Sequence, residues 1–270
     1  MLPTLRDPAL RLLDRARLLR PAYRAYEAVR ARTTSRSREQ APDGLPLPPP
    51  PLRTLVAGTA DAEWFLETGR RSAELVAAAA ARHGVRLDAP GTRLLDFGCG
   101  CGRVTRHWAR LAGADVHGSD YNARLVRWCA EHLPFARFAR NGGDPPLPYP
   151  DGRFDLVYAI SVFTHLTEPR QDAWLTELRR VLRPGGLLLV TTHGDRHADA
   201  LAPDERARYD AGELVVRWES VAGTNLCAAF HPAAYVRERL ARGLELLEHA
   251  AEGAAAGSPH QDLVVLRRPG

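Results

Sequence analysis

From about residue 61 onwards, short apolar segments alternate with longer amphipathic ones. Short apolar runs bounded by turn residues predict buried strands, and apolar residues repeated every three or four positions predict helices. The expected strands are 93–97, 115–119, 135–139, 155–160, 187–192, 244–247 and 263–266. The expected helices are 61–83 (as one helix or two), 104–111, 123–132, 171–182 and 231–242. This alternation predicts a doubly wound α/β fold: a mostly parallel, seven-stranded sheet whose last strand is antiparallel, with helices on both faces.

The first 51 residues have a different pattern. Apolar residues recur at alternating four- and three-residue steps from Leu5 to Tyr26, which predicts a helical arm that Pro21 divides in two. Residues 33–51 are polar and then proline-rich, typical of an extended linker. The pattern therefore divides the chain into an arm with its linker (1–51), a helical cap (52–90) and a main domain (91–270). The main domain has a lid-like insertion (195–230) that is expected to contain a hairpin.

The positive charge of the chain is confined to the arm. Residues 1–40 hold ten arginines and four acidic residues, so the net charge of this segment is +6. Because the net charge of the whole chain is +5, the remaining residues together carry −1. A basic amphipathic helix has several uses. It can dock on the body of the protein, form a homodimer contact, or bind an anionic surface such as RNA or lipid. The pattern alone leaves these uses open.

Composition excludes several classes of protein. Apolar residues make up 45% of the chain and charged residues 26%, enough for a sizeable core. No apolar run is long enough to span a membrane, and the first residues lack the pattern of a secretory signal. The four cysteines have spacings that fit neither a disulfide framework nor a zinc site. We therefore expect a cytoplasmic protein without a structural metal.

The most informative segment runs from Leu94 to Arg103, where a strand leads into three alternate glycines and then a helix. Glycines at such a turn let a ligand approach the backbone amides closely. A dinucleotide fingerprint would require glycine at position 103, where arginine stands. Asp96, two residues before the first glycine, would repel a pyrophosphate but suits a ligand with an ammonium group. The residues of this turn expected to contact a ligand are Asp96, Gly98, Cys99, Gly100 and Gly102.

A second acidic residue follows at the end of the next expected strand. Asp120 is placed there to accept hydrogen bonds from both hydroxyls of a ribose. A glycine loop with Asp120 implies a nucleoside, and Asp96 adds a cationic amino-acid end. S-adenosylmethionine has both parts. At the third strand tip, Asn141 and Gly142 can face the adenine edge, with Asp144 as the alternative.

The run from Leu94 to about Thr192 resembles the class I (Rossmann-like) S-adenosylmethionine-dependent methyltransferases of the small-molecule type. Four motifs carry the resemblance in order: the glycine turn, Leu147-Pro148-Tyr149, Phe154-Asp155-Leu156-Val157 and Arg183-Pro184-Gly185-Gly186. The family has a reversed last strand, which the terminal pair of strands would supply. The resemblance implies that Asp96 and the three glycines form the methionine pocket and that Asp120 holds the ribose, with Tyr121 beside the adenine. The adenine-end role falls on Asn141 and Gly142, where many relatives have aspartate.

Methyl transfer asks little of the protein beyond alignment of the acceptor with the methyl group, because the sulfonium is already a good leaving group. A general base helps when the acceptor is a hydroxyl. Two histidines follow strands at the expected ligand-binding edge, His165 after the fourth and His193 after the fifth. Each can also be an ordinary hydrogen-bonded loop residue. Ser161 is expected to touch the methionine end of the cofactor through its backbone.

The segment after the fourth strand also narrows the acceptor. Ser161-Val162-Phe163-Thr164 stands where enzymes that methylate amino groups of bases or glutamine commonly carry Asn/Asp-Pro-Pro-aromatic. The neutral body lacks the broad basic face of a nucleic-acid enzyme. The insertion 195–230, with Tyr209, Trp218 and Phe230, is expected to close an apolar pocket over a small metabolite, either sugar-containing or polyketide-like.

Three alternatives to transfer of a methyl group to an oxygen or nitrogen of a small molecule stay open. The first is an RNA-directed methyltransferase that grips its substrate with the arm. The second is a non-catalytic scaffold that binds S-adenosylmethionine. The third keeps the fold and the cofactor but uses the sulfonium only for its charge.

Overall fold

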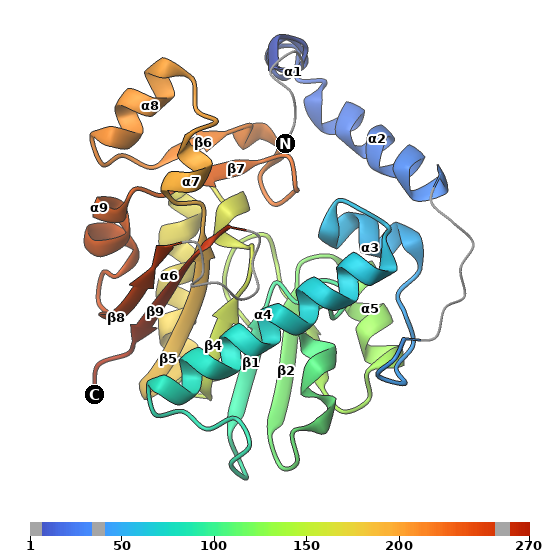
Figure 1. The fold of residues 1–270 in the computed structure, drawn as a ribbon, viewed down its shortest axis with the longest axis vertical. Coiled ribbons are helices and arrows are strands. Elements are labelled where there is room, and N and C mark those ends of the chain that lie inside the picture. The colour runs from blue at the N-terminus through green and yellow to red at the C-terminus, as the bar shows by residue number, and fades with distance from the viewer. Residues whose placement is uncertain (1–6, 34–40, 252–259) are drawn as a thin grey trace.

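The structure is a computed structural model that describes residues 7–33, 41–251 and 260–270 (Figure 1). Its centre is a seven-stranded sheet in the order β3-β2-β1-β4-β5-β9-β8. The strands are β1 (Arg93–Phe97), β2 (Asp115–Asp120), β3 (Arg137–Arg140), β4 (Phe154–Ala159), β5 (Leu182–Thr192), β8 (Glu245–Ala250) and β9 (Asp262–Arg267). The first five are parallel and β9 is antiparallel to both of its neighbours. The predicted fold class and all seven predicted strands are confirmed.

Side chains of the central strands alternate between two buried faces, as period-two strands require. On one face, Leu95 and Val157 pack with α6 (Glu168–Val181) and the π-helical turn η5 (Val236–Leu240). On the other face, Leu94 and Leu156 pack with α4 (Ala62–Arg82) and the short 3₁₀ helix η2 (Thr105–Arg110). Figure 1 shows α4 lying diagonally across the sheet.

The chain order around the sheet creates a crevice. The chain runs outward from β1 through β2 to β3 and then returns to form β4 on the other side of β1. Loops leaving β1 and β4 therefore diverge at the carboxyl ends of these neighbouring strands, which is the usual ligand position in open α/β sheets.

The helices around the sheet follow from local signals. Asp61 caps α4 by accepting a hydrogen bond from the Trp64 N–H (3.1 Å), and the expected segment 61–83 is one helix. Asn122 caps α5 (Ala123–His132) in the same way. The expected helix at 231–242 is shorter, consisting of α9 (Ala233–Tyr235) and η5. Thus only part of that prediction is confirmed.

The arm forms two helices, α1 (Asp7–Arg15) and α2 (Leu19–Thr33), which lie at the top of Figure 1. Their junction is at Arg17, which has a φ of 59°, so the expectation of a break at Pro21 is wrong. Pro21 lies in the first turn of α2, where its missing N–H removes no helical hydrogen bond. Leu19 is buried with Val221 and Cys227, so the described part of the arm docks on its own chain.

The proline-rich segment also differs from its prediction. Pro50 and Pro51 begin a helix, α3 (Pro50–Ala57), because proline fits the first turn of a helix better than its interior. Residues 42–45 of the expected linker form a turn and a bend rather than an extended segment, and residues 34–40 lie outside the described residues. Arg106, which has a side chain buried completely, forms two hydrogen bonds to Asp43 (2.6 and 2.8 Å) and fixes the preceding segment to the body.

The insertion after β5 contains two helices, α7 (Asp195–Ala198) and α8 (Pro203–Asp210). The predicted hairpin is confirmed as β6 (Val215–Arg217) paired antiparallel with β7 (Ala228–Phe230). Between these strands lie the 3₁₀ helix η4 (Glu219–Val221) and the loop that follows it, against which α2 packs.

Candidate active site

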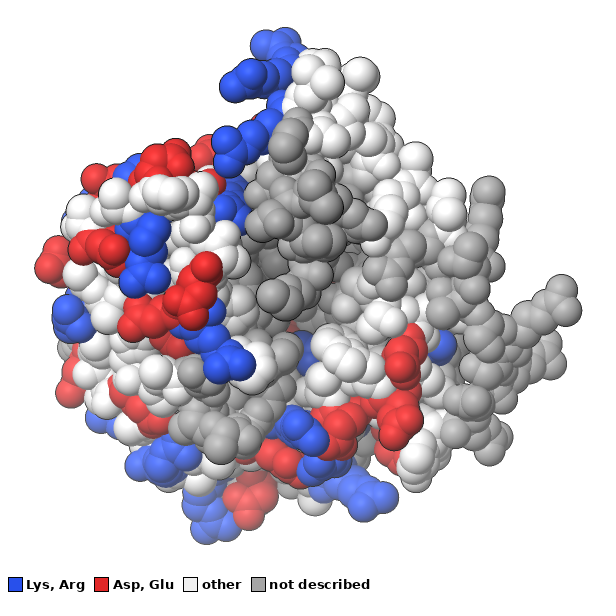
Figure 2. Space-filling view, turned by 45° about the horizontal axis from the view of Figure 1, so that its top comes forward, with Lys and Arg blue, Asp and Glu red and all other residues white. Residues whose placement is uncertain are grey.

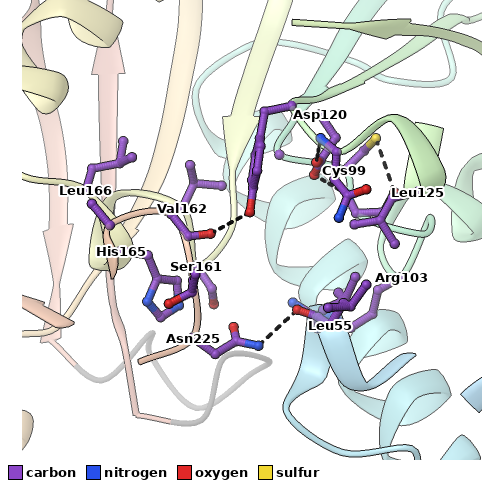
Figure 3. Close-up of a pocket in the computed structure, with 18 of the residues that line it drawn as sticks. Leu55, Cys99, Arg103, Asp120, Leu125, Ser161, Val162, His165, Leu166 and Asn225 are labelled. Carbon is purple, nitrogen blue, oxygen red and sulfur yellow. Dashed lines mark hydrogen bonds between the residues drawn. The ribbon is translucent and has the colours of Figure 1, made fainter. Parts of the chain in front are cut away.

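A cavity of about 650 Å³ opens at the carboxyl ends of β1, β2 and β4 (Figure 3). Its walls come from the glycine turn after β1, the tip of β2, the loop after β4, helices α2 and α3, and residues 221–225. This volume is within the range of about 300–1,000 Å³ that is usual for small-molecule sites. The cavity thus coincides with the crevice that the strand order creates.

The three glycines of the turn all have left-handed backbone conformations, with φ of 78° at Gly98, 57° at Gly100 and 78° at Gly102. Each is also sterically confined. A Cβ atom at Gly98 would lie 2.4 Å from Val162 Cγ2, and one at Gly100 would lie 2.6 Å from Val56 Cγ2. Gly98 and Gly100 line the cavity, whereas Gly102 packs against the end of α5. Only glycine combines this conformation with this close packing.

Asp120 connects the tip of β2 to the glycine turn. Its Oδ2 accepts a hydrogen bond from the Gly100 N–H (3.0 Å), and its Oδ1 accepts one from the Asn122 N–H (2.8 Å). The side chain is buried yet lines the cavity, and burial raises the pKa of its carboxyl. Each carboxylate oxygen has a second lone pair available for a donor in the cavity.

Asp96 and Arg103 bring opposite charges to the inner part of the cavity. Asp96 accepts a hydrogen bond from Thr105 Oγ1 (2.5 Å), and burial raises its pKa to about 6. The attraction of Arg103 acts in the opposite direction on this pKa. Arg103 donates to Ser72 Oγ across 3.4 Å, a long contact that leaves most of its donors available.

His165 lines the cavity in a defined tautomer. Its Nδ1 lies 2.6 Å from the carbonyl oxygen of Cys227. Because a carbonyl can only accept, Nδ1 carries the proton and Nε2 presents a lone pair. No described residue forms a hydrogen bond with Nε2, and burial lowers the pKa of His165. The side chain is therefore neutral and able to accept a proton at neutral pH.

Residues 221–225 are fixed over the cavity by three hydrogen bonds. The Tyr121 hydroxyl donates to the Gly223 carbonyl (2.9 Å), and the Gly223 N–H donates to the His165 carbonyl (2.8 Å). Asn225 Nδ2 donates to the Leu55 carbonyl (2.9 Å), which joins the insertion to α3 across the opening (Figure 3). These bonds connect both sides of the crevice.

Sequence comparisons agree with this geometry. Residues 94–186 match the family model of a methyltransferase domain. The match identifies these residues as a methyltransferase domain. The chain is 36% identical over 155 residues to a fatty-acid O-methyltransferase of Mycolicibacterium smegmatis, an alignment that covers 57% of this chain and 48% of the relative. It is also 36% identical over 110 residues to a 2-methyl-6-phytyl-1,4-hydroquinone methyltransferase of Synechocystis, covering 40% of this chain and 34% of that relative.

A solved structure shares the fold of this methyltransferase domain. The 1,6-didemethyltoxoflavin-N1-methyltransferase of Burkholderia thailandensis was crystallised with 1,6-didemethyltoxoflavin and S-adenosylhomocysteine. It superposes with a TM-score of 0.53 at 16% identity, covering 77% of this chain and 82% of that one. The alignments with the two curated relatives span a third to a half of those proteins' lengths.

The methyltransferase domain brings most of the sequence-predicted residues to one cavity. The predicted residues that line it are Asp96, Gly98, Cys99, Gly100, Asp120, Tyr121, Ser161 and His165. Ser161 has a φ of 58°, and its N–H donates to Thr191 Oγ1 (2.8 Å), so its backbone conformation is fixed at the cavity wall. The predicted residues outside the lining are Gly102, Asn141, Gly142 and His193.

Asn141, predicted to face the adenine, and His193, the second candidate for the general base, lie outside the cavity lining because of where their strands stand in the sheet. Asn141 follows β3, which is two strands from β1, and its N–H donates to the Asp120 carbonyl (3.1 Å). His193 follows β5, one strand beyond β4. Its ring stacks on His197, with ring centroids 4.2 Å apart, and burial lowers its pKa to about 2. Of these two histidines, His165 lines the cavity and His193 does not.

Several lining residues had no signal in the sequence pattern. Arg20, Tyr23 and Arg24 of α2 reach the cavity, as do Leu55 and Val56 of α3. The amphipathic stripe predicts that the arm docks but does not specify where. The expected aromatic closure is wrong in detail: Tyr209 and Phe230 pack in a separate cluster within the insertion, and Trp218 packs beside the arm.

Two features are absent from the residues that the structure describes. None of the helices described is long and apolar enough to cross a bilayer. Within the same residues, no cluster of three histidine, cysteine or acidic side chains is arranged to hold a metal ion.

Proposed function

We propose that this chain is an S-adenosylmethionine-dependent methyltransferase that transfers a methyl group to an oxygen or nitrogen of a small molecule. The observation that carries the proposal is the convergence of Asp96, the glycine turn and Asp120 on one cavity. This arrangement supplies separate partners for the amino-acid end and the sugar of the cofactor. The names of the two curated relatives, both methyltransferases of small molecules, support the same class.

The residues of the cavity fit the cofactor chemically. The free lone pairs of Asp120 suit the two ribose hydroxyls, because a carboxylate is a strong acceptor for paired hydroxyl donors. The aminoacyl end has an ammonium and a carboxylate, for which Asp96 and Arg103 provide opposite charges. A side chain at Gly98 or Gly100 would disrupt the turn that brings the backbone to the ligand.

Bound S-adenosylmethionine supplies an electrophilic methyl group on a sulfonium. The protein orients the acceptor, and His165 takes a proton at Nε2 from a hydroxyl or ammonium acceptor. The Cys227 carbonyl keeps the opposite nitrogen protonated, so this lone pair stays available. The bonds that hold residues 221–225 over the crevice restrict the entry of water.

A small acceptor fits better than RNA because the arm, α3 and residues 221–225 form part of the wall of a cavity whose volume, about 650 Å³, is usual for small molecules. A scaffold that binds the cofactor without turnover is distinguished by the absence of methyl transfer under cofactor saturation. We also propose a cytoplasmic location, since all four cysteines are free, buried thiols.

Calorimetric titration tests the cofactor assignment. We expect S-adenosylhomocysteine to bind with a stoichiometry of about one and NAD to give no heat of binding. The reason is that the turn has arginine at position 103, where a dinucleotide-binding turn has glycine, and that Asp96 would repel a pyrophosphate. Clear binding of NAD without binding of S-adenosylhomocysteine would overturn the assignment.

The variant Asp120→Ala should bind S-adenosylhomocysteine more weakly by about 1–3 kcal/mol, the cost of losing hydrogen bonds to a charged group. Asp151→Ala is the matched control, since Asp151 is exposed and pairs with Arg180 outside the cavity. Circular dichroism would confirm folding of both variants. An unchanged affinity in folded Asp120→Ala would refute the ribose role.

The affinity for S-adenosylhomocysteine should fall by about tenfold from pH 8 to pH 5. Asp96 has a pKa of about 6 in the free protein, and the cationic ammonium binds the ionised carboxylate better. One pH unit below this pKa, about a tenth of the carboxylate stays ionised. Asp96→Asn should bind more weakly at pH 8 and lose this dependence. A wild-type affinity that is constant over this range would exclude Asp96 as the ammonium partner.

A further inference from the structure

The cavity contains more positive charge than the cofactor needs. Four arginines (Arg20, Arg24, Arg103 and Arg124) and two aspartates (Asp96 and Asp120) line it. Asp96, Asp120 and Arg103 have partners in the proposed cofactor. The other three arginines form no ion pair with any carboxylate whose side chain the structure describes. Their charge at this cavity is thus unused by the proposed function.

Helix α2 is held so that two of these arginines face the cavity. Leu19 is 2% exposed and anchors the start of the helix among the apolar residues of η4 and the loop after it. Arg20 Nε donates to the Ser220 carbonyl (3.2 Å), which leaves its terminal nitrogens without a described partner. Arg24 follows one turn later, so it lies on the same face of the helix. Figure 2 shows arginine side chains running down from the top of the molecule over the arm.

Arg124 approaches from a different element. It lies in the first turn of α5, directly after the β2 tip, and this turn holds no acidic residue. Arg20 likewise lies in the first turn of α2, which also holds no acidic residue. A cation near a helix N-terminus is unfavourable, because the helix dipole is positive there. An anion in the cavity would offset this unfavourable placement at both helices.

The wall beside these arginines is apolar. Tyr23 lies between Arg20 and Arg24 in the sequence and lines the same cavity, together with Leu55 and Val56 of α3 and Val221 and Ala222 of the insertion. An apolar wall next to guanidinium groups is complementary to a molecule with an apolar body and an anionic end.

We propose that the methyl acceptor carries an oxyanionic group, such as a carboxylate, sulfate or phosphate, on an apolar body, and that Arg20, Arg24 and Arg124 bind this group. The identification of the ligand as the acceptor rests on the proposed function, whereas the anion site itself does not. The arm then selects the acceptor: its arginines hold the charged end while the apolar wall holds the body.

A pair of fluorescent probes tests the site without turnover. The anionic 1-anilinonaphthalene-8-sulfonate and the neutral N-phenyl-1-naphthylamine share an apolar body and differ in the sulfonate. Titrated into full-length protein with S-adenosylhomocysteine present, the anionic probe should bind more tightly than the neutral one. Arg20→Gln/Arg24→Gln should weaken the anionic probe by about tenfold, the scale of one charge-assisted hydrogen bond, and leave the neutral probe unchanged.

Matched variants separate charge from folding. Arg15→Gln removes an exposed arginine of α1 outside the cavity and should leave both probes unchanged. Arg20→Lys/Arg24→Lys should retain most of the preference for the anionic probe. If the glutamine variant displaces the arm, both probes change together while the lysine variant binds both normally. In that case the same comparison is made with Arg124→Gln, which leaves the arm intact.

Competition identifies the chemistry of the ligand. Dodecanoate and dodecyl phosphate should displace the anionic probe, and dodecan-1-ol should do so far less well. The proposal is overturned if dodecan-1-ol competes as well as the two anionic ligands, or if a short RNA displaces the probe while dodecanoate does not. It is also overturned if Arg15→Gln weakens the anionic probe as much as Arg20→Gln/Arg24→Gln does, or if Arg124→Gln weakens both probes equally. Calorimetry with S-adenosylhomocysteine decides the proposed function separately, because it does not depend on the arginines of the arm.

Discussion

His165→Ala is expected to methylate a hydroxyl acceptor about 10²–10⁴ times more slowly than the wild type, the usual contribution of a general base. The structure gives the reason: Nδ1 is committed to the Cys227 carbonyl, and Nε2 presents its lone pair in the cavity. Initial rates measured with a radiolabelled methyl donor under cofactor saturation would show the effect in kcat.

The pH profile of the same reaction provides a second readout. Because burial lowers the pKa of His165, the base stays neutral below the usual histidine range. The wild-type rate should therefore hold as the pH falls through about 6.5 and decline only below it. His193→Ala, which alters a histidine outside the lining, is the matched control and should change kcat by less than about tenfold. A His165→Ala rate close to that of the wild type would eliminate this histidine as the base.

Gly98→Ala is expected to weaken the binding of S-adenosylhomocysteine by at least about 30-fold. Two effects combine: a left-handed conformation costs an alanine about 1–2 kcal/mol, and overpacking typically costs about 1–3 kcal/mol more. The φ at this position is 78°, and the new Cβ would lie 2.4 Å from Val162 Cγ2. The loop must therefore shift at the point where it forms the cavity wall. Calorimetry would measure the loss.

Gly143→Ala is the control for this substitution. The nearest atom to its added Cβ would be Arg170 Nη2 at 3.8 Å, and the position is outside the cavity lining. Its affinity for the ligand should match the wild type. Gly98→Ala/Val162→Ala should recover part of the lost affinity, since it removes the clashing methyl groups but not the backbone strain. A Gly98→Ala protein that binds normally would show that the turn does not contact the ligand.

Local patterns were sufficient for the sheet and for the inner part of the site. The glycine turn, Asp96 and Asp120 follow directly from strand ends, and a strand end fixes both the residue and the edge of the sheet at which it lies. The order of strands in the sequence does not directly give the distance of each strand end from the crevice. Neighbouring strands are about 4.8 Å apart, so loops after β3 and β5 are displaced from the crevice between β1 and β4. That displacement separates Asn141 and His193 from the residues that line the cavity.

The outer part of the site depends on long-range packing. Arg20 and Arg24 reach the cavity because Leu19 is buried against residues about 200 positions later in the chain. Periodicity identifies the apolar stripe of α2 but not the surface that receives it. Local chemistry also misplaced two boundaries, at Pro21 and at Pro50, because proline ends a helix in its interior but is well tolerated in its first turn.

A crystal structure with S-adenosylhomocysteine tests the central claim most directly. The account predicts electron density in the cavity, with both ribose hydroxyls within hydrogen-bonding distance of the Asp120 carboxylate and the amino group facing Asp96. Density for the ribose beside any other carboxylate, or a saturated crystal in which the cavity holds no ligand, would contradict it.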